Sequence, residues 1–118
     1  PRCHFYGFVP EEDVDNFFRA ADCALFPYTV QMSSSGPMAL AIANETLVLA
    51  SDCFRGVVPD NLIFERNSRS MKAKMIEAKS NKLNSEMKEI LKIKEKSNWR
   101  NIAKLTEKVY SQLQGKKK

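Results

Sequence analysis

The chain has 118 residues, of which 43% are hydrophobic and 28% are charged. This length and composition are typical of one globular domain and argue against a disordered chain or a pair of complete domains. The net charge of +5 conceals a division near residue 60, because residues 1–60 contain 3 basic and 8 acidic residues whereas residues 61–118 contain 16 basic and 6 acidic ones.

The first half of the chain predicts alternating strands and helices. β-forming and aromatic residues precede Pro10, acidic residues then suit the positive end of a helix, and short apolar runs follow that are typical of strands buried in a parallel sheet. The predicted elements are, in chain order, a strand at 3–9, a helix at about 11–21, a strand at 23–26, a helix at 36–43, a strand at 46–50 and a short strand at 62–64. This order is typical of right-handed βαβ units, so the predicted fold class is α/β with a parallel sheet.

The second half predicts helices only, because apolar residues recur at helical spacing over 71–78, 83–91 and 99–113. The lysines alternate with these apolar stripes, as on the solvated outer faces of helices. Aromatic residues that could stack on bases do not interleave with them, so we expect no nucleic-acid partner. Lys88, Lys92 and Lys96 share one helical stripe and predict a weak attraction to an anionic membrane surface.

The sequence predicts a cytoplasmic location, including the inner face of a membrane. No apolar run approaches the roughly 20 residues that span a bilayer, and the first residues do not resemble the start of a signal peptide. Cys3, Cys23 and Cys53 are widely spaced, so we expect reduced thiols that serve as small buried side chains.

One loop has the character of a ligand site. Residues 28–37 (YTVQMSSSGP) leave the carboxyl end of a predicted parallel strand and enter a helix N-terminus, where ligands bind in open α/β sheets. The hydroxyls of Ser33, Ser34 and Ser35 and the backbone N–H groups up to Gly36 predict a site for a phosphate or diphosphate. Ordinary capping of the helix by serine explains the same residues equally well.

Other chemistry has weaker support. His4 has no second histidine nearby, and a solvated helix start explains the acidic residues at 11–15. No group of cysteine, histidine and carboxylate residues has the spacing of metal ligands, so we expect no metal ion.

The ordered set of motifs resembles the family-4 (group 1) glycosyltransferases, which have the GT-B fold. Residues 5–14 (FYGFVPEEDV) and 18–27 (FRAADCALFP) are similar to that family's F-x-G-x-V-x-x-x-D-L and Y-x-x-A-D-x-x-x-x-P stretches. Residues 35–52 resemble its G-x-P-x-x-E-A-M-A-x-G-x-P-V-V-A-S-D segment, and 62–65 and 97–110 resemble the segments that follow it. The resemblance runs in register over essentially the whole chain.

The resemblance implies a three-layer, Rossmann-like fragment, the C-terminal donor-binding part of a retaining hexosyltransferase of glycan biosynthesis. Such an enzyme transfers a sugar from a nucleotide-sugar to a glycan or lipid-linked acceptor, with no cofactor and no bound metal. The residues implied to cradle the donor diphosphate are Ser33, Ser34, Ser35 and Gly36. The residues implied to line the base pocket are Phe8, Val9, Pro10 and Glu11.

The chain also departs from the family. Two glutamates that contact the donor sugar and the ribose would fall at Met32 and Leu40, and neither residue is acidic. Glu45-Thr46 stands where the family has Gly-Thr. The alternatives are a catalytically inactive glycosyltransferase-like binding module or remnant, and an unrelated flavodoxin-like phosphate or nucleotide binder.

With this resemblance, the chain order predicts a single domain over 1–118. It would comprise a βαβαβ donor-binding core at 1–66, closing helices at 67–114 and a disordered basic tail at 115–118. GT-B enzymes place the active site between two Rossmann-like domains. The resemblance therefore implies an N-terminal Rossmann domain as a partner, in cis or as a separate subunit, without which this chain is inactive.

Overall fold

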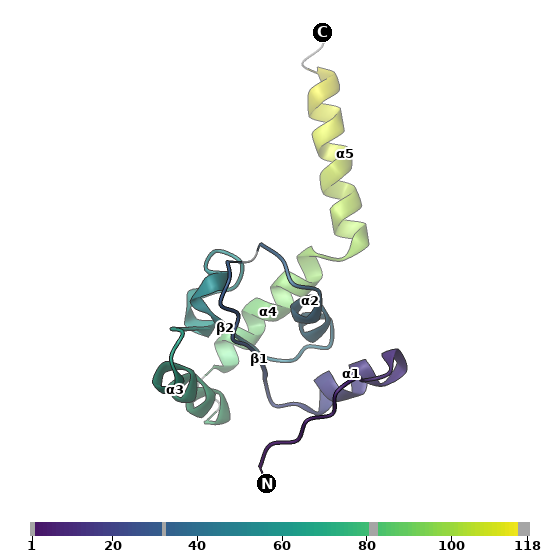
Figure 1. The fold of residues 1–118 in the computed structure, drawn as a ribbon. Coiled ribbons are helices and arrows are strands. Elements are labelled where there is room, and N and C mark those ends of the chain that lie inside the picture. Colours follow the sequence, from purple (N-terminus) through teal and green to yellow (C-terminus); the bar gives the residue numbers. More distant parts are fainter. Residues whose placement is uncertain (1, 32, 81–82, 116–118) are drawn as a thin grey trace.

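The fold is α/β, with an open three-stranded sheet and five α-helices, in a computed structural model that describes residues 2–31, 33–80 and 83–115 (Figure 1). The elements are α1 (Glu11–Ala20), β1 (Ala24–Phe26), α2 (Gly36–Ala43), β2 (Val48–Ser51), β3 (Ile63–Phe64), α3 (Ser68–Lys79), α4 (Asn84–Lys96) and α5 (Trp99–Gly115). Two short 3-10 helices, η1 (Asp52–Phe54) and η2 (Asp60–Leu62), lie between β2 and β3. The predicted α/β class and its parallel sheet are confirmed.

Strand β2 is the centre of the sheet and of the core. The strand order is β1-β2-β3, and both pairings are parallel, with Leu25 opposite Leu49 and Ser51 opposite Phe64. All four residues of β2 have no exposed surface. A strand that is covered on both faces has no polar side to present to water, which explains why its first three residues are all apolar.

The predicted strand at 3–9 is wrong. Residues 2–10 form no strand, and Phe5, Tyr6 and Phe8 are 98%, 68% and 90% exposed. A β-forming composition becomes a strand only when a neighbouring strand completes its hydrogen bonds. Among the described residues, no strand pairs with this segment.

The cysteines are free thiols, as expected, but they are less buried than predicted. Cys3 is exposed, and Cys23 and Cys53 are half-buried. Burial raises the pKa of the Cys23 thiol, and the negative charge of the adjacent Asp22 adds to this effect. Cys23 is therefore held in its neutral form.

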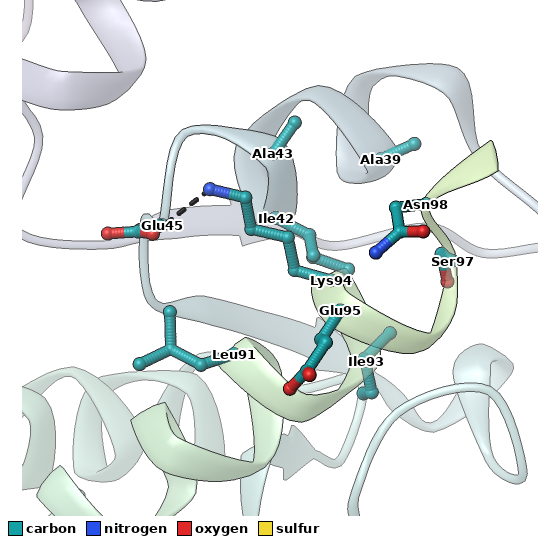
Figure 2. A pocket seen from close by; sticks show the side chains of 10 residues that line it. All are labelled: Ala39, Ile42, Ala43, Glu45, Leu91, Ile93, Lys94, Glu95, Ser97 and Asn98. Carbon is teal, nitrogen blue, oxygen red and sulfur yellow. Dashed lines mark hydrogen bonds and ion pairs between the residues drawn. The ribbon is translucent and has the colours of Figure 1, made fainter. Parts of the chain in front are cut away.

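The turn between α2 and β2 places Glu45 at φ +59°, in the left-handed region that glycine adopts most readily. The Glu45 carboxylate accepts a hydrogen bond from Lys94 Nζ at 3.0 Å, which ties this turn to α4 (Figure 2). Both side chains are about half exposed, so this ion pair contributes little to stability.

We expect Glu45→Gly to be more stable than Glu45→Ala by about 1 kcal/mol, because both variants lose the ion pair but only alanine keeps a Cβ in the left-handed conformation. Urea unfolding followed by the NMR signals of β2 measures this difference. Equal stability of the two variants would contradict the strain that φ implies.

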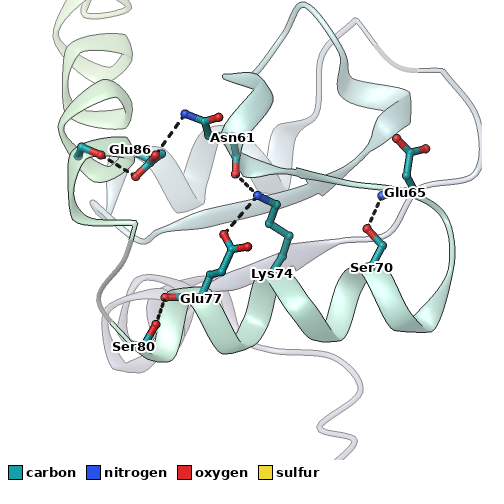
Figure 3. Close-up of polar contacts among 8 residues, drawn as sticks. Asn61, Glu65, Ser70, Lys74, Glu77, Ser80 and Glu86 are labelled. Atoms are coloured by element: carbon teal, nitrogen blue, oxygen red, sulfur yellow. Dashed lines mark hydrogen bonds and ion pairs between the residues drawn. The ribbon is translucent and has the colours of Figure 1, made fainter.

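Polar contacts fasten α3 and α4 to the segment between β2 and β3. Lys74 Nζ donates to Asn61 O at 2.8 Å and pairs with Glu77 at 3.3 Å (Figure 3). Asn61 Nδ2 donates to Glu86 Oε1 at 3.2 Å, and Ser85 Oγ donates to Glu86 Oε2 at 2.8 Å. The Ser85 hydrogen bond is the main cause that lowers the pKa of Glu86. Apolar side chains of both helices also join the core, with Ile90 only 1% exposed.

Helix α5, which was predicted to be one of the closing helices, does not pack on the core as α3 and α4 do. It extends away from the sheet (Figure 1), and none of its side chains is buried. The radius of gyration, 17.3 Å, exceeds the about 13–14 Å typical of a compact chain of this length. Gly115 is the last residue of α5, and residues 116–118 of the predicted tail lie outside the described residues. Within the described part of the chain, no helix combines the length and the apolar character needed to cross a bilayer.

Candidate functional site

The carboxyl edge of the sheet gathers three segments that are distant in the sequence. Because the strands are parallel, the residues that follow β1, β2 and β3 emerge at the same edge. Tyr28, Asp52 and Arg66 follow these strands in that order. In open α/β sheets, this edge is where ligands bind.

The loop from β1 to α2 presents donors at this edge. Ser35 is the N-cap of α2, and its Oγ accepts a hydrogen bond from the Met38 N–H at 3.3 Å. Ser33, Ser34 and Gly36 are exposed, and Pro37 carries no N–H. The Ser35 side chain is therefore engaged in capping, whereas Ser33, Ser34 and Gly36 are exposed residues near the positive end of the helix dipole.

The core fixes the position of this loop through Tyr28. The Tyr28 hydroxyl lies 3.1 Å from Ser35 Oγ, and the Tyr28 carbonyl accepts a hydrogen bond from the buried Ser51 hydroxyl at 2.7 Å. The Tyr28 ring packs on Phe54, with a centroid distance of 5.0 Å. Side chains of the central strand and of η1 thus hold the start of the loop, and the Tyr28 hydroxyl in turn contacts its end at Ser35.

Arg66 brings a positive charge to the same edge. Its Nε lies 2.9 Å from Asp52 Oδ1, and its NH1 donates to the Thr29 carbonyl at 3.1 Å. Asp52 Oδ1 is buried and has no directed hydrogen bond from the described residues, so this ion pair is the contact that compensates its charge. The Arg66 side chain remains half exposed, with N–H groups free to meet a ligand.

The structure places some of the predicted site residues together and leaves others apart. Ser33, Ser34, Ser35 and Gly36 share the edge described above. Leu40 lies one turn farther along α2 and is 45% exposed, and Met32 lies outside the described residues.

The segment predicted to line a base pocket lies at the start of α1. Phe8, Pro10 and Glu11 are exposed, and Val9 is half-buried. Helix α1 is held through Asn44, which donates to Asp15 at 2.9 Å and accepts from Arg19 at 3.1 Å. Asn44 caps the end of α2 opposite to Gly36, so these contacts do not bring the segment to the serine loop. The base pocket stays a prediction.

Sequence reasoning missed Asp52 and Arg66 as site residues, and it assigned no role to Tyr28, which begins the predicted loop. Each lies within two residues of the end of an observed strand. The signal was present in the sequence, because polar residues that follow successive parallel strands meet at one edge.

A second, apolar hollow of about 720 Å³ lies between α2 and α4. Figure 2 shows Ile42 of α2 and Leu91 and Ile93 of α4 lining it, with the Glu45–Lys94 ion pair at its rim. Its lining is mainly apolar, and its rim carries two carboxylates, Glu45 and Glu95, beside the single cation Lys94, which does not favour an anion.

The carboxyl edge therefore offers hydrogen-bond donors, a helix dipole and the half-exposed guanidinium of Arg66, which is paired with Asp52 on one side. Together these groups suit a phosphate or diphosphate. Within residues 2–31, 33–80 and 83–115, no group of three or more histidine, cysteine or acidic side chains could hold a metal ion. In comparisons with known proteins, no family model, curated protein or solved structure matches the chain at a significant level.

Proposed function

We propose that this chain binds the diphosphate of a nucleotide-sugar at Ser33–Gly36, as the donor-binding part of a retaining glycosyltransferase. The observation that carries the proposal is the position of these residues. They form an exposed, donor-rich loop at the N-terminus of α2, on the carboxyl edge of a parallel sheet. A diphosphate meets several N–H and O–H donors there.

The contacts of Ser35 support this proposal over simple capping. Capping requires one serine, and Ser35 fills that role through Met38. Ser33 and Ser34 contribute nothing to the cap, so capping does not account for them. The hydrogen bonds of Tyr28 hold the loop in place before a ligand arrives, which lowers the entropy lost on binding.

Arg66 supports an anionic ligand in particular. Its contacts with Asp52 and Thr29 hold the guanidinium at the edge through two of its nitrogens. NH2 and the second N–H bond of NH1 can then donate to phosphate oxygens. Arg66 and the α2 dipole would then act on the same ligand.

The identity of residue 40 favours a second candidate, a binding module without transferase activity. The resemblance implies an acidic residue that touches the ribose at this position, whereas Leu40 is apolar and 45% exposed. Leucine offers no hydrogen bond to a hydroxyl, so nucleotide binding would depend on the diphosphate contacts. The two candidates share the same anion site and differ only in whether a sugar is transferred.

Titration of the chain with UDP-, GDP- and ADP-sugars, followed by backbone amide shifts, tests the site. We expect one of them to shift the amide signals of residues 33–36 at millimolar concentration. Ser34→Asp places a negative charge in the loop and is expected to weaken binding at least about 10-fold, by repulsion of the diphosphate.

The matched control is Ser111→Asp, which makes the same change at an exposed position of α5, the helix that extends away from the sheet. It should leave the affinity within about 2-fold of the unmodified chain, because a charge far from the carboxyl edge is screened from the proposed site. The proposal fails if no nucleotide-sugar shifts residues 33–36, or if the two variants weaken binding equally.

A further inference from the structure

Helix α5 is an isolated arm with an amphipathic sequence. Its described contacts with the rest of the chain are at its start, where Asn101 Nδ2 donates to Glu95 O at 2.7 Å and the Asn101 N–H donates to Asn98 Oδ1 at 2.9 Å. From there it extends for its full 17 residues, about 25 Å, away from the sheet (Figure 1).

One face of α5 is apolar and open to solvent. At 100° per residue, its large apolar side chains fall within an arc of about 140°. They are Trp99, Ile102, Leu105, Val109, Tyr110 and Leu113, which are 85%, 39%, 62%, 54%, 64% and 51% exposed. An exposed apolar strip along a whole helix is an interaction surface, because its exposure to water is unfavourable.

The opposite face of α5 is basic. Arg100, Lys104 and Lys108 follow one another at intervals of four residues and so share one side of the helix. Glu107 is the one acidic residue of α5. In the sequence, three further lysines come after α5, at 116–118. A helix with an apolar face and a basic face is complementary to a layer whose interior is apolar and whose outer surface is negatively charged.

We propose that α5 binds an anionic lipid bilayer, lying in its interface with the apolar face toward the acyl chains and the cations among the phosphate headgroups. Trp99 and Tyr110 lie within about 20° of each other on the helix, on one flank of the apolar face, where an aromatic ring with a polar tip suits the boundary between headgroup and hydrocarbon. This inference concerns α5 alone and does not depend on nucleotide binding.

The one polar side chain within the apolar face is already satisfied. Thr106 Oγ1 donates to the Ile102 carbonyl at 2.9 Å, within the helix. A hydroxyl that is hydrogen-bonded internally can enter an apolar environment without losing a bond to water. Thr106 therefore does not oppose burial of this face.

A second copy of the chain is a poorer occupant. The apolar face spans little more than two heptads, whereas coiled coils are sustained over at least three or four. The positions that flank the helical seam carry Ala103, Leu105, Tyr110 and Gln112, so no charge pairs across a dimer would set its register. Dimer formation also leaves the basic face without a role.

Trp99 is the only tryptophan of the chain and reports directly on the proposed contact. We expect its emission to shift to the blue and to become shielded from acrylamide when vesicles of phosphatidylcholine and phosphatidylglycerol are added. Vesicles of phosphatidylcholine alone should bind much more weakly, and high salt should reduce binding to the anionic vesicles. Replacing Arg100, Lys104 and Lys108 together by glutamine should weaken partitioning into anionic vesicles about 100-fold.

Leu105→Glu, in the apolar face, should abolish the shift, whereas Ser111→Glu, on the polar face, introduces the same charge and should reduce binding only several-fold. Sedimentation of the chain without lipid is the companion measurement. The proposal is overturned if anionic vesicles leave the Trp99 emission unchanged, if both glutamate variants bind equally, or if the chain instead forms a dimer that Leu105→Glu dissociates.

Discussion

Phe54→Ala is expected to lower the free energy of unfolding by about 3–5 kcal/mol, which is a large part of the stability of a small domain. Phe54 has no exposed surface, lies in η1 directly after the central strand, and packs its ring against Tyr28. Truncation removes the apolar contacts of the ring and leaves a cavity that the surrounding backbone can only partly fill. Urea unfolding followed by the amide signals of β2 measures the loss.

Phe5→Ala is the matched control, because it removes the same ring at a position that is 98% exposed. Its expected effect is within about 0.5 kcal/mol of zero. If Phe54→Ala is unfolded without urea, Phe54→Leu, which retains much of the volume, keeps the comparison quantitative. Similar losses from Phe54→Ala and Phe5→Ala would mean that Phe54 is not part of the core.

The second large effect is expected from Ser51→Ala, with a loss of about 1–3 kcal/mol in the free energy of unfolding. The Ser51 hydroxyl is fully buried and donates to the Tyr28 carbonyl at 2.7 Å. Alanine leaves that carbonyl without its donor in a partly buried site, so the hydrogen bond is lost and part of the desolvation cost of the carbonyl appears. Because Tyr28 also holds Ser35, the amide signals of residues 33–36 should shift as well.

Ser80→Ala is the control that separates the effect of burial at Ser51 from the effect of losing a hydrogen bond. The Ser80 hydroxyl also donates to a backbone carbonyl, that of Glu77, at 3.0 Å, but at the exposed end of α3. Water can replace this donor, so we expect a change of no more than about 0.5 kcal/mol. If the two serine variants lose equal stability, the burial of Ser51 is not what makes its hydrogen bond important.

Local signals in the sequence were sufficient to predict the helices and the order in which strands and helices follow one another in the core. Helix α2 begins and ends at the predicted residues, Gly36 and Ala43, because Ser35 caps it and Pro37 suits its first turn. The apolar runs that became β1 and β2 are recognisable since a strand buried on both faces carries no polar alternation. These properties belong to short stretches of chain and can be read from them.

Properties that depend on a partner could not be predicted in the same way. The composition of residues 3–9 favours a strand, but the segment has no neighbouring strand among the described residues and forms no regular element. The apolar spacing of α5 predicted a helix correctly, and it could not indicate whether another element covers the apolar face. Both cases arise because a periodic pattern specifies which face is to be buried and not what buries it.

The serine loop of the candidate site was predicted, whereas the contacts that hold it in place were not. Ser33–Gly36 stood out because hydroxyls and a glycine precede a helix after a strand. The Arg66–Asp52 ion pair and the Tyr28–Ser35 contact join residues from separate loops, and their geometry follows from the register of the sheet. Such contacts become visible only when the strands are aligned.

The isolation of α5 has a consequence for how the chain unfolds. A 17-residue helix that buries none of its side chains has little more than its own backbone hydrogen bonds to stabilise it, and a free helix of that length is marginal in water. Local opening of α5 therefore costs much less free energy than opening of β2, so the two form separate cooperative units. Trp99 fluorescence and the β2 amides would then record different transitions, and a bilayer that binds α5 would stabilise the first without changing the second.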